Sequence, residues 1–433
     1  MGLFPMKMAI LLLIAGMLSG AEITATANPA RPTTLVFLTW KPSQPEGWKR
    51  LLREFHDQNP RIHVKTQVAP HSSTQYHAII TQRLKNRDAS VDVFFMDVVW
   101  PPEFGNAGWV LDLTPRFPVE RQKQFLQGPL TANKWRGKLY GIPCYLGAGL
   151  FYYRKDLLQK YGFDPPSTWE EMLEAGKAIL KGEGDPGLYI YSGQFKQYEG
   201  LVCDMLEFLW SNGGAVMNPE TGQVVLGEPS ALRAVAFVRD RIIGEAAPVG
   251  AVNYEEPESL GLFIQEKAVF HRNWPYAWAV ANNPEKSKIA GRVGVTALPA
   301  FSGHHSASTL GGWQFGINRY SRHPEEAWKF IRFMSSARSQ KILALQSGLA
   351  PTRRSVYGDP EIQERMPHLR AFLPAFEKAR PRPLSPVYPM ISQELQRYFS
   401  RAIVEKDAPL REMAKAASAR IERLVKLATM VGK

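Results

Sequence analysis

Residues 137–158 read GKLYGIPCYLGAGLFYYRKDLL, and they decide how the chain is organised. The opening Gly-Lys-Leu-Tyr-Gly is typical of a turn that enters a strand. Ile142-Pro143 then predicts a stiff extended step, because the residue before a proline is kept out of the helical region. Tyr145 follows, and Gly147 and Gly149 leave the backbone exposed beside its ring. We interpret the stretch as a crossover, in which the chain leaves one lobe, passes a hinge and begins a second lobe.

The size of the chain also indicates more than one lobe. It has 433 residues, which is too many for one ordinary hydrophobic core. Hydrophobic residues make up 45% and charged residues 21%, close to the values of globular proteins, so wholesale disorder is not expected. We expect a signal peptide at 1–27, a first lobe built from 28–142 and 303–347, and a second lobe built from 143–302 and 348–433, with a helical C-terminus.

The N-terminus has the features of a cleavable secretory signal. Lys7 supplies the positive region, and residues 8–18 form an apolar run that is too short to span a bilayer. Ala25-Thr26-Ala27 fits a small-x-small cleavage site, which would start the mature chain at Asn28. No cysteine lies near this site, so a lipid anchor is not expected. The sequence therefore predicts a periplasmic or other extracytoplasmic protein.

The net charge is +13, and removing Lys7 and Glu22 with the signal leaves it unchanged. A basic balance can indicate a nucleic-acid partner. Here the basic residues are scattered along the chain, and the protein is predicted to be exported. We therefore expect no nucleic-acid partner.

The chain has two cysteines, Cys144 and Cys203. In an exported protein they could form one disulfide. Isolated buried thiols are the commoner outcome for two cysteines in apolar surroundings. The sequence leaves both possibilities open.

The first part of the chain alternates between strand and helix patterns. Strands are expected at 34–40, 61–68 and 91–96, with helices at 46–57 and 76–85 between them. This β-α-β-α-β order predicts an α/β fold with a parallel sheet. Ligands of such sheets bind beyond the carboxyl ends of the strands, where Trp40 and Asp97 lie. Further strands are expected at 189–192, 268–271 and 292–298.

Four short segments place aromatic rings at the ends of strands or at loops. They are Trp40, Cys144-Tyr145, Trp274-Pro275-Tyr276 and Gly312-Trp313. A sugar has a flat apolar face edged by hydroxyl groups, so aromatic rings stack on the face. Carboxylates and guanidinium groups pair with the hydroxyls, and Glu46, Asp97, Glu199 and Arg353 are available for that role. Each ring could instead pack in a core, and each charged group could instead cap a helix or form a surface ion pair.

Other chemistries have weaker support in the sequence. His304-His305 could suggest a metal, but no third ligand is spaced nearby. The sequence has no G-x-S-x-G, H-E-x-x-H or phosphate-binding loop. A glycosidase needs two carboxylates that flank one bond, and the context of Asp97 and Glu199 does not single out an acid and a nucleophile. We therefore expect no catalytic residue, no metal and no cofactor.

Six segments resemble the extracellular solute-binding proteins of ATP-driven sugar importers, specifically the trehalose/maltose-binding group. They are DVFFMDVVW (92–100), GKLYGIPCYLGAGLFYYRKDLL (137–158), KQYEGLVCDMLEFLWSNGG (196–214), RNWPYAWA (272–279), VGVTALPAFSGHHSASTLGGWQFGI (293–317) and RPRPLSPVYP (380–389). Together they span nearly the whole mature chain in order. The resemblance implies a two-lobed periplasmic-binding-protein fold of the type II kind, with the ligand in a cleft between lobes joined by hinge crossovers.

The resemblance also implies roles for individual residues. Glu46 and Asp97 match carboxylates that bond sugar hydroxyls, and Arg353 matches a hydroxyl-binding arginine. Gly312 matches a backbone contact, and Tyr145, Trp274, Tyr276 and Trp313 match residues that stack on or border the sugar. Two positions depart from the family pattern. Gly147 stands where the family has aspartate in Y-x-D-A-G, and a family arginine of the second helix is replaced near Tyr76-His77.

We predict that the chain is the monomeric substrate-binding component of an ABC-type carbohydrate importer. It would capture an α-glucoside such as trehalose or maltose by hinge closure and deliver it to the permease subunits of the inner membrane. Two alternatives are kept. One is a receptor for another sugar derivative, a glycosyl-polyol or a sugar phosphate, and the other is an exported glycoside-active enzyme.

Overall fold

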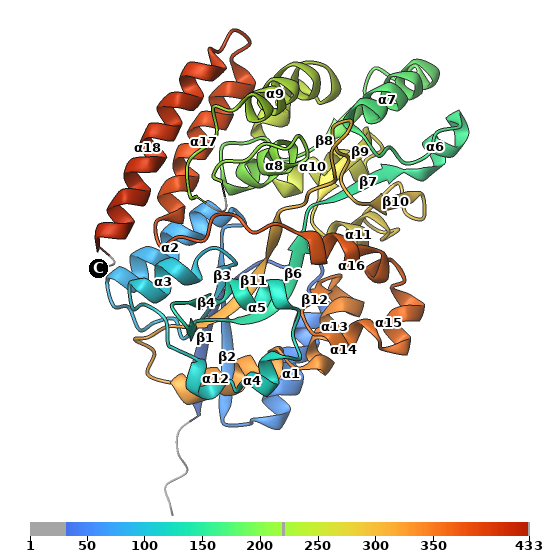
Figure 1. Cartoon of the computed structure of the whole chain (residues 1–433). Helices are drawn as coiled ribbons and strands as arrows, with labels where there is room; N and C mark the ends of the chain where they lie inside the picture. Colours follow the sequence, from blue (N-terminus) through green and yellow to red (C-terminus); the bar gives the residue numbers. More distant parts are fainter. Residues whose placement is uncertain (1–31, 219–220, 432–433) are drawn as a thin grey trace, which may run out of the picture.

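The computed structural model describes residues 32–218 and 221–431, and it has two lobes that are each built around a β-sheet (Figure 1). The first sheet has the strand order β12-β6-β11-β3-β1-β2, and the second has the order β10-β7-β9-β8. The expected signal peptide at 1–27 lies outside the described residues. Within the described residues, no helix is both long and apolar enough to cross a membrane.

The first sheet has a parallel half and an antiparallel half. β1 runs parallel to β2 and β3, as the alternating pattern predicts. β11 runs antiparallel to β3 and β6, and β12 runs antiparallel to β6. The strands are β1 (Thr33–Trp40), β2 (Ile62–Ala69), β3 (Val93–Asp97), β6 (Ile142–Ala148), β11 (Leu310–Ile317) and β12 (Ala350–Pro351). The helices of this lobe are α1 (Glu46–Gln58), α2 (Ser73–Lys85), α3 (Pro101–Asn106), α4 (Val119–Gln122), α5 (Gln127–Ala132), α12 (Pro324–Met334) and α13 (Ala337–Ser347), and a small hairpin joins β4 (Lys134–Trp135) to β5 (Lys138–Leu139).

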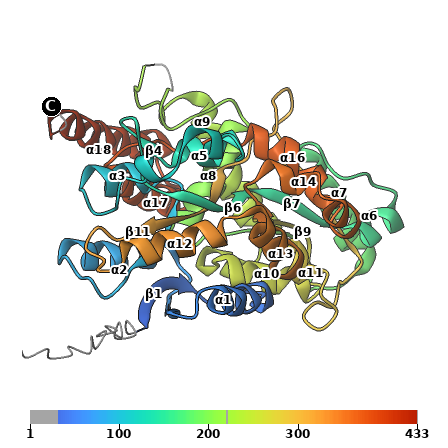
Figure 2. The same ribbon diagram turned by 90° about the horizontal axis from the view of Figure 1, so that it is seen from below.

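The second sheet carries β7 between β10 and β9, antiparallel to both, while β8 runs parallel to β9. Its strands are β7 (Leu150–Arg154), β8 (Tyr189–Ser192), β9 (Ala268–Asn273) and β10 (Val293–Thr296). The helices around it are α6 (Lys155–Tyr161), α7 (Trp169–Glu183), α8 (Glu199–Trp210), α9 (Pro229–Phe237), α10 (Glu256–Ile264), α11 (Ala277–Ala281), α17 (Tyr388–Val404) and α18 (Leu410–Val431). Seen from below, α17 and α18 lie at one end of the molecule and α6 lies at the other (Figure 2).

Each lobe has its own hydrophobic core, and a third apolar cluster lies where the lobes join. The junction cluster contains Leu146 at the end of β6 and Leu150 at the start of β7. It also receives α16 (His368–Lys378), which follows α14 (Arg354–Tyr357) and α15 (Pro360–Arg365). Burial of this surface ties the two lobes together at one edge and leaves the opposite edge free to form a cleft.

Three chain segments cross side by side between the lobes. The first passes through Gly149, between β6 and β7. The second passes through Ser308 and Thr309 on the way to β11, and the Ser308 hydroxyl donates to the Gly149 carbonyl at 2.8 Å. The third passes through Arg380, whose N–H donates to Ser308 O at 2.8 Å and whose carbonyl accepts from Leu310 N at 2.8 Å. These hydrogen bonds, one from the Ser308 side chain and two between backbone groups, join the three crossings into one hinge.

The hinge corrects the lobe boundaries expected from the sequence. The boundary expected after residue 142 falls inside β6. The pairing of β6 with β11 shifts by one residue between Trp313 and Gln314, and this irregularity lets Pro143 remain in the strand. The return placed at 303 lies instead at Ser308 and Thr309. The segment 348–433 divides: β12 pairs with β6 of the first sheet, whereas α17 and α18 pack in the core of the second lobe.

Cys144 and Cys203 are free and buried in different lobes. Burial raises the pKa of both thiols well above the ordinary value, so both remain protonated and unreactive near neutral pH. The structure therefore favours buried thiols over the disulfide.

Candidate functional site

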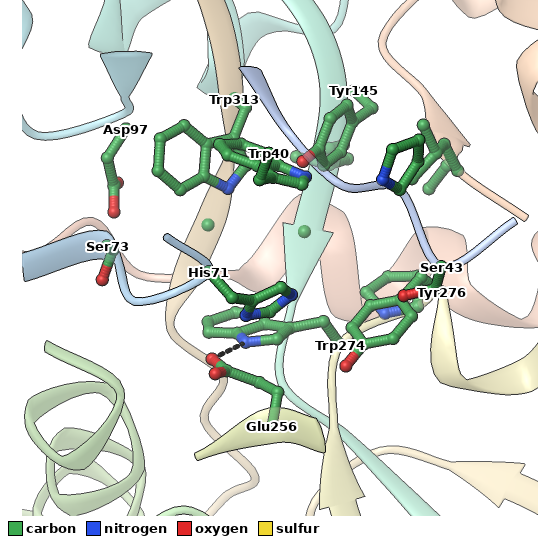
Figure 3. Close-up of a pocket in the computed structure, with 18 of the residues that line it drawn as sticks. Trp40, Ser43, His71, Ser73, Asp97, Tyr145, Glu256, Trp274, Tyr276 and Trp313 are labelled. Carbon is green, nitrogen blue, oxygen red and sulfur yellow. Dashed lines mark hydrogen bonds between the residues drawn. The ribbon is translucent and has the colours of Figure 1, made fainter. Parts of the chain in front are cut away.

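A pocket lies between the lobes, and side chains from both lobes line it (Figure 3). The first lobe contributes Trp40, Ser43, His71, Asp97, Tyr145 and Trp313, and the second contributes Glu199, Glu256, Trp274 and Tyr276. The pocket lies beyond the carboxyl ends of β1 and β3, which is where a parallel sheet presents a ligand site.

Aromatic rings form the wall on the first lobe. Trp40 ends β1, and its ring centroid lies 4.0 Å from that of Trp313, with the two planes at 65°. Behind Trp40, the ring of Phe95 stacks at 4.7 Å. Tyr145 meets Trp40 edge-on at 6.4 Å. Because each ring is packed against another, this wall is a preformed apolar surface.

The backbone of Gly312 shapes the same wall. Its φ is +114°, a conformation that favours glycine. A Cβ at this position would lie 2.5 Å from Tyr145 O, so no other residue fits without movement of the strand. Gly312 thus lets β11 approach β6 and places Trp313 at the pocket.

Trp274 forms the wall on the second lobe, at the end of β9. Its indole Nε1 donates to Glu256 Oε1 at 3.1 Å. Its ring lies against two glycines of the first lobe: a Cβ on Gly311 would be 2.8 Å from Trp274 Cζ3, and a Cβ on Gly147 would be 3.4 Å from Trp274 Cε3. The glycines therefore make room for a large ring that crosses the cleft.

One end of the pocket carries a buried ionic bridge between the lobes. Arg382 Nη2 lies 2.5 Å from Asp97 Oδ1, and Nη1 lies 2.6 Å from Glu199 Oε1. Glu199 also accepts from the hydroxyls of Tyr388 and Ser392. Burial lowers the pKa of Arg382, but Asp97 and its other acidic neighbours outweigh that effect and raise the pKa well above its ordinary value. The guanidinium therefore stays charged and joins a carboxylate of each lobe.

The structure brings together six of the eight predicted site residues, namely Asp97, Tyr145, Trp274, Tyr276, Gly312 and Trp313. Glu46 does not line the pocket. It begins α1, its side chain is 67% exposed, and it pairs with Lys49 at 2.9 Å. A carboxylate in the first turn of a helix interacts favourably with the positive end of the helix dipole.

Arg353 does not line the pocket either. Its Nε donates to Ser335 O at 2.6 Å, Nη1 donates to Gln124, and its guanidinium carbon lies 4.4 Å from the centroid of the Phe125 ring. These contacts hold a loop of the first lobe. The arginine at the pocket is Arg382, which lies in the third crossing, in the segment RPRPLSPVYP. The signal that could have identified it is an arginine fixed between two prolines in a segment between lobes.

His71, Glu255 and Glu256 approach each other across the mouth of the cleft, with potential ligand atoms within 4.8 Å of one another. Lys196 already pairs with Glu255 at 2.6 Å, and Trp274 already donates to Glu256. Each of the two carboxylates is therefore already matched by a donor of the protein.

His271 supports the turn that carries Trp274 and makes stability depend on pH. Its Nδ1 donates to Ser192 O at 3.1 Å, and its Nε2 accepts from Asn273 Nδ2 at 2.9 Å. Burial lowers the pKa of His271 from 6.5 to about 3. The unfolded chain therefore binds a proton first, so this group's stabilisation is present above pH 6.5 and is lost as the pH falls toward 3.

We expect the free energy of unfolding to fall by up to about 4 kcal/mol from this group between pH 6.5 and pH 3, at about 1.4 kcal/mol per pKa unit. Urea unfolding of the protein and of His271→Gln at pH 7, 5 and 4 measures it. The variant is less stable at pH 7 but loses less stability on acidification. Equal pH dependence in both proteins would contradict the assignment.

A model of the family described as bacterial extracellular solute-binding protein matches residues 41–341. A probable ABC transporter-binding protein of Deinococcus radiodurans is 36% identical over 352 residues, which cover 80% of this chain and 83% of the relative. An arabinooligosaccharide-binding protein of Bacillus subtilis is 22% identical and covers 83% of this chain and 82% of the relative.

Solved structures agree with these sequence comparisons. Maltose-bound MalE3 of T. maritima has a TM-score of 0.86 and 37% identity, covering 90% of this chain and all of the other. The GacH receptor of Streptomyces glaucescens, solved without ligand and with acarbose, has a TM-score of 0.80 and 22% identity, covering 91% of this chain and 98% of the other. At that identity the second likeness supports the two-lobed fold alone.

Proposed function

The chain belongs to the bacterial extracellular solute-binding protein family and is the substrate-binding component of an ABC sugar importer, and we propose that it captures an α-linked glucoside, maltose or trehalose. The observation that carries the proposal is the pair of aromatic walls. Trp274 of one lobe and Trp313 with Trp40 of the other face the same pocket. A sugar ring between them buries both of its apolar faces.

The charge of the pocket supports a neutral ligand. Its acidic lining residues are Asp97, Glu199 and Glu256, and its basic ones are Arg382 and His71. Although the whole chain carries +13, the site is therefore acidic and would repel a sugar phosphate.

The same residues argue against a glycoside-active enzyme. Asp97 and Glu199 are the two carboxylates that could serve as acid and nucleophile, but both are bonded to one guanidinium. Because Arg382 occupies both carboxylates, neither is free to flank a glycosidic bond as an acid or a nucleophile. The pair is therefore suited to binding hydroxyl groups between the lobes.

Closure of the hinge is the proposed mechanism, and contacts between the lobes support it. Lys286 Nζ of the second lobe donates to Ser43 O at 2.9 Å and to Gln44 Oε1 at 3.2 Å in the first lobe. Glu199 N donates to the Thr74 hydroxyl at 3.2 Å. A sugar that touches both lobes adds contacts that the open form cannot make, and so it shifts the population to the closed form that docks on an inner-membrane permease.

Titration calorimetry with maltose, trehalose, a glucosyl-polyol and glucose 1-phosphate tests the ligand. Binding of maltose or trehalose, without a chromatographic trace of hydrolysis, supports the proposal. Tight binding of the phosphate ester with none of the neutral sugars would overturn it, and release of glucose would support the enzyme.

Light scattering during size-exclusion chromatography tests the monomer, and extraction of the periplasm tests the proposed location.

Gly147 offers a test of specificity, because the sequence resemblance described above implies an aspartate at this position. A Cβ at Gly147 would lie 3.2 Å from Gly312 N and 3.4 Å from Trp274 Cε3, so any side chain presses on the wall of the pocket. We expect Gly147→Asp to weaken maltose binding roughly 10-fold by displacing Trp274, an effect of the size of mild overpacking. Gly147→Ala, with the Cβ alone, separates crowding from charge. Tighter binding by Gly147→Asp than by the wild type would contradict this.

A further inference from the structure

Behind the Trp274 ring lies a buried guanidinium that the sugar does not reach. Arg272 precedes Trp274 by two residues at the end of β9, and its side chain is 1% exposed. Its guanidinium carbon lies 4.1 Å from the centroid of the Trp274 ring, well within the range of a cation–π contact. Arg272 is not among the residues that line the pocket. The ring that forms one wall of the site therefore rests on a fixed positive charge.

Arg272 is itself held by a rigid set of buried acceptors. Nε and Nη2 donate to the two oxygens of Glu207 at 2.7 and 2.6 Å, and Nη1 donates to Gln194 Oε1 at 3.1 Å. Asp204 Oδ1 lies 3.0 Å from Nη1. The bidentate pair fixes the plane of the guanidinium, because the planar fork of arginine matches the carboxylate. An ammonium group could supply the charge but not this plane.

Glu207 in turn contacts two of the three hinge crossings. Its Oε1 accepts from Thr309 N at 3.0 Å, in the second crossing. In the first crossing, a Cβ on Gly149 would lie 2.0 Å from the same Oε1 and 2.8 Å from Arg272 Nη2. The pair of Arg272 and Glu207 therefore fills the space directly against the point where the chain changes lobes.

We propose that Arg272 is a positioning residue that sets the plane of the Trp274 ring and, through Glu207, couples that ring to the hinge at Gly149 and Thr309. The proposal rests on the proposed sugar-binding function of the pocket. Rotation of the lobes must change the backbone at the crossings, and Glu207 is bonded to one crossing and packed on the other. From Glu207 such a change reaches the ring through the two hydrogen bonds to Arg272 and the stacked contact of Arg272 with Trp274, which is a continuous physical path.

The same lobe supplies a matched control. Arg154, at the end of β7, is also buried and also makes a two-atom pair, with Asp156, through Nε at 2.8 Å and Nη2 at 2.6 Å. Neither residue lines the pocket or lies at a crossing. We therefore expect that removing the Arg154 guanidinium lowers the stability of the protein but leaves the Trp274 ring and the hinge in place.

The first experiment compares Arg272→Met, Arg272→Lys and Arg154→Met by maltose calorimetry and thermal unfolding. We expect Arg272→Met to weaken maltose binding roughly 10- to 100-fold and Arg272→Lys by an intermediate factor, because lysine keeps the charge without the plane. Arg154→Met stays within about 2-fold of the wild type. A loss of melting temperature in Arg272→Met with wild-type affinity would assign it a purely structural role and overturn the proposal.

A second measurement needs no sugar, so it tests the coupling even where maltose binding fails. The near-ultraviolet circular dichroism of Trp274 is obtained as the difference between a protein and its Trp274→Phe variant. We expect Gly149→Ala to change this difference spectrum although Gly149 packs on Glu207 rather than on the ring. The change is expected to disappear when Arg272→Met is also present.

An unchanged spectrum in Gly149→Ala, or equal changes with and without Arg272, would overturn the coupling. Absence of maltose binding by the wild type, with the spectral coupling present, would overturn only the sugar assignment.

Discussion

Arg382→Met is expected to abolish measurable maltose binding, with a loss of about 100- to 1000-fold or more. Asp97 and Glu199 come from opposite lobes, and Arg382 compensates the charge of both of them between the lobes. Methionine preserves much of the apolar stem but leaves two buried carboxylates facing each other without a cation. Removing one partner of such a buried pair costs about 3–5 kcal/mol, and here the cost falls mainly on the closed form because opening the lobes lets water reach both carboxylates.

Calorimetry with maltose measures the affinity, and small-angle X-ray scattering at saturating maltose measures closure. Arg380→Met is the matched control, since Arg380 is exposed in the same crossing and contributes to the hinge through its backbone. A second variant, Arg382→Met with Glu199→Gln, removes one of the facing charges and is expected to recover part of the closure. Wild-type affinity in Arg382→Met would show that the bridge does not support the bound state.

The fold of the first lobe could be predicted largely from hydrophobic patterns. The β-α-β-α-β order of residues 33–97 is as expected, and α1 begins at Glu46 as predicted. These elements are encoded locally, because their apolar spacing matches the period of a helix or a strand. The lobe boundary expected after residue 142 lies at the start of β6, which continues through Pro143 to Ala148. The bulge that accommodates Pro143 depends on β11, which lies far away in the sequence.

The aromatic part of the site could also be predicted, because rings beside glycine or proline at strand ends leave a local signature. Trp274, Tyr276 and Trp313 all reach the pocket. The charged part could not be predicted in the same way. Arg382 and Asp97 are separated by 285 positions, and Arg382 lies in a segment without helix or strand periodicity. A charged residue in such a segment can be assigned to the site only from the groups that lie near it in space. From the sequence alone, Glu46 and Arg353 are as plausible as Arg382 as charged residues of the site.

Trp274→Ala is expected to weaken maltose binding about 100-fold or more and to remove most of the sugar-induced change in tryptophan fluorescence. Truncating a large aromatic anchor at the centre of a binding site typically costs about 2–4 kcal/mol. Here the loss has three parts: the stacking face itself, the indole donor to Glu256, and the ring that covers the guanidinium of Arg272.

Trp278→Ala is the control, because Trp278 lies four residues further on, packs on His368 at 4.6 Å, and does not line the pocket. Stopped-flow fluorescence of both variants with maltose separates association from dissociation. If Trp274 acts by holding sugar in the closed cleft, its removal raises the dissociation rate far more than it lowers the association rate, since the open lobes still admit the sugar. An unchanged affinity, or a loss confined to association, would show that this ring does not hold the sugar between the lobes.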